Sequence, residues 1–69
     1  MPKLPRDISS ERLVRFLLRQ GWTLAREGGR HTILSRAGVQ VAVPRHARLA
    51  TGTLAAVFKQ CIIQDWTSL

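Results

Sequence analysis

Most of the side chains from which catalytic centres are built are scarce in this chain. Its 69 residues include only four acidic ones, and all four lie outside the segment 28–64: Asp7, Glu11, Glu27 and Asp65. Paired-carboxylate sites and carboxylate cages for metal ions need acidic residues close together, so this distribution argues against both. The histidines and the cysteine lack the spacing of a zinc site, and no phosphate-loop or dinucleotide fingerprint occurs. We therefore expect no metal and no cofactor.

Two further absences bear on the compartment. The only cysteine, Cys61, has no partner for an internal disulfide and lies in an apolar pattern, where it is expected to pack as a small hydrophobic residue. The apolar runs are far shorter than the roughly 20 residues of a membrane-spanning helix, and residues 1–5 lack the apolar stretch of a signal peptide. These features predict a cytoplasmic protein that does not contact membranes.

Positive charge is what the chain has in excess. Eleven lysines and arginines against four acidic residues give a net charge of +7 and an isoelectric point near 11.7. Between residues 28 and 64 no carboxylate neutralises the cations Arg30, Arg36, Arg45, Arg48 and Lys59. Proteins with this charge balance commonly bind polyanions, so composition favours a nucleic-acid partner.

A first helix is predicted from about residue 10 to residue 20. Ser9 is its candidate N-cap, and Ile8 is placed to pack on Leu13. Glu11 falls in the first turn, where the helix dipole favours a carboxylate. Gly21 is the expected left-handed residue that ends the helix. The side chains expected to face the core recur at helical spacing, namely Leu13, Phe16 and Leu17.

Three short antiparallel strands are predicted next, over residues 22–26, 31–35 and 39–43. Gly28 and Gly29 form the first turn, and Pro44 closes the last strand because it has no backbone donor. A three-residue connection, Arg36-Ala37-Gly38, is expected between the second and third strands.

Alternation of polar and apolar residues predicts which side chains face the core. In the first strand these are Trp22 and Leu24, and core packing is favoured over base stacking for Trp22. In the second strand Ile33 is expected to face inward, with His31 on the same face at the strand start, where it can still reach solvent. In the third strand the shared face carries Val39, Val41 and Val43.

A second helix is predicted after Thr51, its candidate N-cap, with an apolar stripe of Leu54, Val57, Phe58, Cys61 and Ile62. The expected architecture is therefore α+β, a single small domain over residues 1–69 in the order α-β-β-β-α. Its antiparallel three-stranded sheet carries both helices on one face. Residues 1–7 and 64–69 are expected to be irregular, and the pattern gives no place to Trp66.

The two histidines fall at the ends of adjacent predicted strands. His31 begins the second strand, and His46 follows the end of the third. In an antiparallel pair the start of one strand faces the end of the next, so both imidazoles are expected at one edge of the sheet. Histidine is also the only side chain of this chain whose proton moves near pH 7 without strong tuning.

Several motifs together resemble a known protein family. They are Gly29-Arg30-His31-Thr32-Ile33, then Val41-Ala42-Val43-Pro44-Arg45-His46, then Gly52-Thr53-Leu54, preceded by an amphipathic helix and Gly21-Trp22. In order and spacing this pattern is similar to the HicA toxins of bacterial toxin–antitoxin systems, from about Ser10 to Ile63.

The resemblance implies a fold like the double-stranded RNA-binding domain and activity as a metal-independent mRNA endoribonuclease. It also implies a HicB-type antitoxin that holds the activity off, with oligomerisation through that antitoxin. By position, the catalytic histidine of the family falls on His31. The chain departs from the family pattern at Arg30, where serine is usual; the change adds a phosphate-binding donor beside the histidine and also a bulky side chain.

The residues fit such chemistry by themselves, because RNA carries its own nucleophile in the 2′-OH group and needs only an acid or base and cations around the phosphate. His31 is the candidate acid or base, with Arg30 and Arg45 beside the phosphate. The candidate RNA-binding set is Gly29, Arg30, Arg45, His46, Arg48 and Lys59, the last two tracking the backbone away from the cut.

Alternatives remain open at this point. His46 can serve as a second acid or base, as a phosphate donor or as a hydrogen-bonded loop residue. The backbone N–H groups of Gly52 and Thr53 form a further possible anion site at a helix start. For the whole chain, the alternative to a nuclease is a non-catalytic RNA-binding module of the same fold. A DNA-binding protein would need a helix free to enter a groove of DNA, and no such recognition helix is evident.

Overall fold

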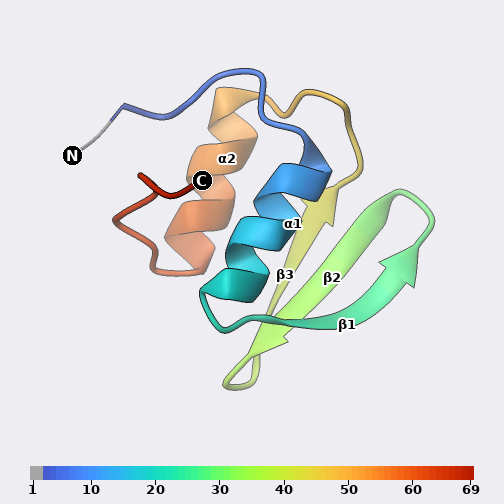
Figure 1. Ribbon diagram of the computed structural model, residues 1–69. Coiled ribbons are helices and arrows are strands. Elements are labelled where there is room, and N and C mark those ends of the chain that lie inside the picture. Colours follow the sequence, from blue (N-terminus) through green and yellow to red (C-terminus); the bar gives the residue numbers. More distant parts are fainter. Residues whose placement is uncertain (1–2) are drawn as a thin grey trace.

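The computed structural model describes residues 3–69 and has two layers. An antiparallel sheet of three strands in the order β1-β2-β3 forms one layer. Two helices on one face of the sheet form the other, and their apolar sides enclose the core (Figure 1). In chain order the elements are α1 (Ser10–Arg19), β1 (Thr23–Gly28), β2 (His31–Arg36), β3 (Val39–Pro44) and α2 (Thr51–Gln60). The predicted α-β-β-β-α architecture is confirmed.

Both ends of α1 follow the sequence signals. The Ser9 side chain accepts a hydrogen bond from the Arg12 backbone N–H at 3.1 Å, which satisfies one of the free donors of the first turn. At the other end Gly21 has a φ of +95°, and the Trp22 N–H returns to the Leu17 carbonyl at 3.0 Å. This is a Schellman ending, and it delivers buried Trp22 directly onto the core.

The faces of β2 are the reverse of the prediction. Thr32 and Leu34 are buried under the helices, whereas Ile33 is half-buried on the outer face and His31 is exposed there. The cause is the turn between β2 and β3, which has two central residues and not three. Ala37 and Gly38 both take positive φ, so Arg36 pairs with Val39 and Leu34 with Val41. One residue of register reverses every side chain of a strand.

Leu24 pairs with buried Leu34 and so lies on the helix face, as predicted, but its side chain is 44% exposed and is not packed in the core. β1 is an edge strand, and its register shifts between Leu24 and Arg26 in a bulge. The helices pack mainly against β3, which is the strand at the opposite edge of the sheet. β1 therefore extends beyond the helices, and all six of its residues are exposed.

Two predictions about α2 are corrected. Ala50, and not Thr51, is the N-cap, and it provides no side-chain bond; the Leu54 N–H binds the Ala50 carbonyl at 3.0 Å. Ile62 is 84% exposed because the helix ends at Gln60 and Ile62 takes a φ of +56°. The next N–H, of Ile63, then returns to the Phe58 carbonyl at 2.9 Å. The rest of the predicted stripe is buried.

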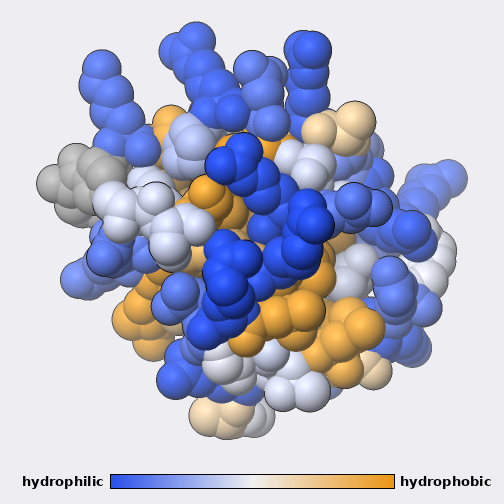
Figure 2. Space-filling view, in the orientation of Figure 1, coloured by the Kyte–Doolittle hydropathy of each residue, from blue (hydrophilic) through white to orange (hydrophobic). Residues whose placement is uncertain are grey.

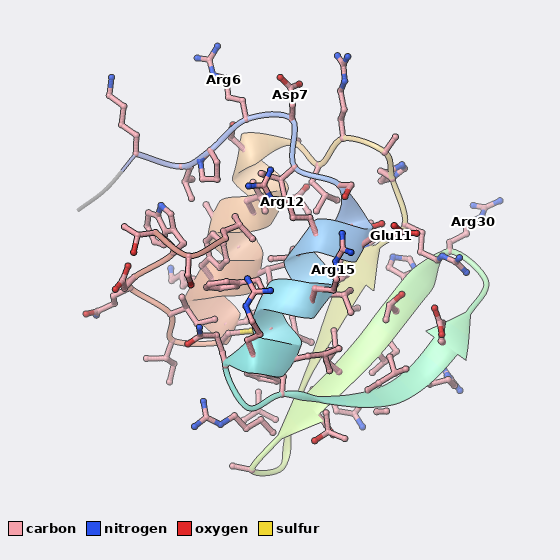
Figure 3. The ribbon with its side chains drawn as sticks, in the orientation of Figure 1. Arg6, Asp7, Glu11, Arg12, Arg15 and Arg30 are labelled. Carbon is pink, nitrogen blue, oxygen red and sulfur yellow. The ribbon has the colours of Figure 1, made fainter. Side chains whose placement is uncertain are left out.

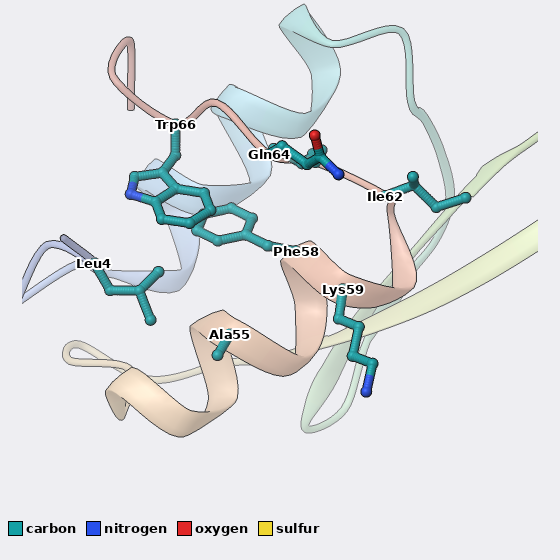
Figure 4. A pocket seen from close by; sticks show the side chains of 8 residues that line it. Leu4, Ala55, Phe58, Lys59, Ile62, Gln64 and Trp66 are labelled. Carbon is teal, nitrogen blue, oxygen red and sulfur yellow. The ribbon is translucent and has the colours of Figure 1, made fainter. Parts of the chain in front are cut away.

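Residues 64–69 form neither helix nor strand, yet they are packed. Trp66 stacks on Phe58 with ring centroids 5.1 Å apart, and its indole N–H donates to the Lys3 carbonyl at 3.0 Å (Figure 4). Arg12 and Arg19 of α1 donate to the main-chain oxygens of Leu69 and Ser68, each at 2.9 Å. The C-terminal segment is thereby held against both helices.

Cys61 packs in the core as predicted, and its burial raises the pKa of the thiol to about 11. Burial favours the neutral thiol, so its contribution to stability is present below pH 9 and is lost between about pH 9 and pH 11.

We expect iodoacetamide to alkylate Cys61 slowly in the folded protein at pH 8, because the thiolate is the reactive form. The rate should rise as the pH approaches 11. Urea-unfolded protein is the control and should react at the rate of a free cysteine. Equal rates for folded and unfolded protein at pH 8 would contradict this assignment.

Candidate functional site

Most of the predicted site residues lie around one hollow at one end of the sheet. The hollow lies where the β1–β2 turn meets the exit of β3. Its walls are formed by Gly29, Arg30, His31, Pro44, Arg45 and His46. Figure 3 shows the Arg30 side chain projecting from the body of the molecule at this end. Both histidines thus lie at the same end of the sheet, as predicted.

Strand register brings these residues together. His31 is the first residue of β2 and pairs with Gly28 on one side and Pro44 on the other. Beyond the last pair, the Arg45 N–H donates to the Arg30 carbonyl at 2.9 Å, which extends the β2–β3 ladder by one bond. Paired residues share a face of the sheet, so His31 and Pro44 lie on the outer face.

His46 is fixed through its backbone. Its carbonyl accepts a hydrogen bond from the Ser10 N–H at the start of α1, at 3.0 Å, and the Leu49 N–H donates to the Ile8 carbonyl at 2.8 Å. The loop after β3 is therefore tied to the segment that leads into α1. Arg48 lies in the same loop, where its Nε is 3.6 Å from an Asp7 carboxylate oxygen; both side chains are largely exposed.

The hollow is cationic and open. No acidic residue lines it, and Arg30, His31, Arg45 and His46 are all exposed. Within residues 3–69 no side-chain hydrogen bond or ion pair involves any of these four. Their donors are thus available to a ligand. More widely, Figure 2 shows hydrophilic side chains spread over the face of the molecule on which α1 lies. An arrangement of two guanidinium groups and two imidazoles suits a phosphate.

Two predicted anion-binding features lie apart from the hollow. Lys59 is in the last turn of α2, and Figure 4 shows its side chain pointing away from Trp66. That end of α2 adjoins Arg36 and Val39, at the opposite end of the strands from His31. Gly52 and Thr53 lie in the first turn of α2 and do not line the hollow.

The described part of the chain, residues 3–69, contains no group of three or more side chains placed to hold a metal ion. None of its helices is long and apolar enough to cross a membrane.

Comparison with known proteins gives one match. The family model described as the HicA toxin of bacterial toxin-antitoxin matches residues 10–63, which is most of the chain. No curated protein and no solved structure matches.

Proposed function

Because this chain belongs to the HicA toxin family of bacterial toxin–antitoxin systems, we propose that it is a metal-independent endoribonuclease that cleaves mRNA. The observation that supports this most directly is the acid-free hollow that is lined by His31 together with Arg30 and Arg45. A phosphodiester there meets a proton-transfer group and two cations in one place.

In the proposed reaction the 2′-OH of the substrate attacks the adjacent phosphorus. His31 accepts the 2′ proton, the O2′–P bond forms, and the P–O5′ bond breaks. The leaving 5′ oxygen takes a proton, from His31 or from His46 across the hollow, and the products are a 2′,3′-cyclic phosphate and a 5′-OH. Positioned acid–base catalysis of this kind contributes about 10²–10⁴-fold. Arg30 and Arg45 stabilise the charge that develops on the phosphorane oxygens.

One feature favours the second candidate, an RNA-binding module without chemistry. Arg30 stands where serine is usual in the family, and its side chain lines the hollow next to His31. A bulky guanidinium adds a phosphate donor but also occupies space that the substrate needs. Cleavage and binding therefore have to be measured separately.

We expect the purified chain to cleave single-stranded RNA in excess EDTA and to leave 2′,3′-cyclic phosphate ends. His31→Ala should reduce the rate by at least about 10²-fold, since the proton-transfer group is lost. RNA affinity and thermal stability should change little, because the exposed side chain at a strand start contributes little to the core. Cleavage retained in His31→Ala would move the chemistry to His46, and intact RNA with the wild type would support the binding module.

The two predicted phosphate contacts at opposite ends of the molecule should differ in the RNA length they require. Arg45→Ala should weaken binding of a four-nucleotide RNA and lower the slope of log affinity against log salt by up to about one unit. Lys59→Ala should have this effect only with RNA long enough to pass along α2. Unchanged slopes for both variants with long RNA would exclude this path for the backbone.

As a HicA-family toxin the chain acts with an antitoxin partner. We propose that the partner is of the HicB type and that its carboxylates meet Arg30, Arg45 and Arg48. Inhibition then works by covering His31. We expect bound antitoxin to protect His31 from diethyl pyrocarbonate, and the association rate to fall steeply with ionic strength. Equal modification of His31 in free and bound toxin would mean that inhibition acts from a distance.

A further inference from the structure

A second groove, on the helix side of the sheet, adjoins the hollow at His31. It runs between α1 and the edge strand β1 and has a volume of about 290 Å³. Arg45 lines both the groove and the hollow, so the two are contiguous. The groove residues that matter for its chemistry are Glu11, Arg15, Leu24, Glu27, Thr32 and Arg45.

The fold builds this groove because β1 extends beyond the helices. Glu27 of β1 pairs with Thr32 of β2, so both residues lie on the helix face. Thr32 is only 6% exposed, and it directly follows His31, whose side chain lies on the outer face. Leu24 and half-buried Val14 of α1 provide apolar wall. His31 and the groove residue Thr32 are therefore neighbours in β2, but their side chains lie on opposite faces of the sheet.

The groove holds two carboxylates and two guanidinium groups that do not pair with each other. Within residues 3–69 the one ion pair closer than 4.0 Å joins Arg48 and Asp7, so Glu11, Glu27, Arg15 and Arg45 are without ionic partners. Figure 3 shows that Glu11 projects from α1 on the side nearer Arg30. A ligand in this groove meets acceptors and donors together, between apolar walls. Phosphate does not suit it, because the carboxylates repel a phosphate.

A nucleobase fits these requirements, and guanine fits them best. Its N1–H and N2 amino group are adjacent donors that suit a carboxylate, while O6 and N7 are the pair of acceptors that a guanidinium binds. Its ring faces can rest on Leu24 and on the plane of an arginine. The other bases offer fewer adjacent donors to a carboxylate.

We propose that this groove is a base-recognition pocket that selects guanine in the nucleotide next to the cleaved phosphate, with Glu27 as the main discriminating residue. The inference rests on the proposed function, because it places the phosphate at His31. Arg45 then contacts the RNA where the RNA passes from the outer face to the helix face of the sheet. Glu27 is chosen over Glu11 because Glu11 also stabilises the first turn of α1.

A binding experiment tests the pocket without any cleavage. Titration of the ¹⁵N-labelled full chain with 5′-GMP should shift the amide signals of Leu24, Glu27 and Thr32, and 5′-AMP, 5′-CMP and 5′-UMP should do so less. The proposal is overturned if GMP binds no more tightly than UMP, or if it shifts only signals elsewhere. GMP binding at the groove with no cleavage of any RNA by the wild type would sink the nuclease but leave the pocket standing.

A pair of matched variants tests its role in specificity. Glu27→Gln and Asp7→Asn each remove one negative charge, and asparagine tolerates the positive φ of 58° at position 7. Both should strengthen non-specific RNA binding slightly, because the net charge rises equally. Only Glu27→Gln should reduce the preference for guanine beside the cut, by roughly 10-fold. An unchanged preference in Glu27→Gln, or an equal loss in Asp7→Asn, would show that the groove does not read the base.

Discussion

Two main-chain hydrogen bonds at one end of the sheet determine where the functional groups lie. The Arg45 N–H binds the Arg30 carbonyl, and the Ser10 N–H binds the His46 carbonyl. The first bond holds the end of β3 beside the start of β2, and the second attaches the following residue to α1. Because backbone and not side-chain atoms make these bonds, the guanidinium and imidazole groups remain available to a ligand. A cationic site can thus be positioned without neutralising any of its charges.

The order of the elements was predictable because each carries a local signal. Ser9 caps α1, Gly21 ends it, and the stripe around Phe58 fixes the inward face of α2. The face of β2 was not predictable in the same way. Ala37 adopts a positive φ although alanine rarely does, and the resulting two-residue turn sets a register that a count of loop residues missed. Tertiary packing of the sheet outweighs this local cost.

The candidate site was likewise predictable only in part. The meeting of His31, Arg30, Arg45 and His46 follows from antiparallel geometry and was predicted from the positions of two histidines. The groove on the helix side was not, because it depends on the bulge after Leu24 and on the inward face of Thr32. An apolar residue such as Leu24 in an alternating segment indicates a core side chain, and no local signal marks a strand that extends past its helices.

The arrangement of the sheet also explains where the few carboxylates lie. A protein that binds a polyanion gains affinity from each carboxylate it lacks. Two of the four acidic residues of this chain, Glu11 and Glu27, nevertheless line the groove next to the hollow. In the path of the phosphates they would oppose binding. Glu27 lies instead on the helix face of the sheet, while His31 lies on the outer face. The thickness of the sheet thus separates a surface suited to phosphate from one suited to the polar edge of a base, and the reversal of β2 relative to the sequence pattern is what creates that separation.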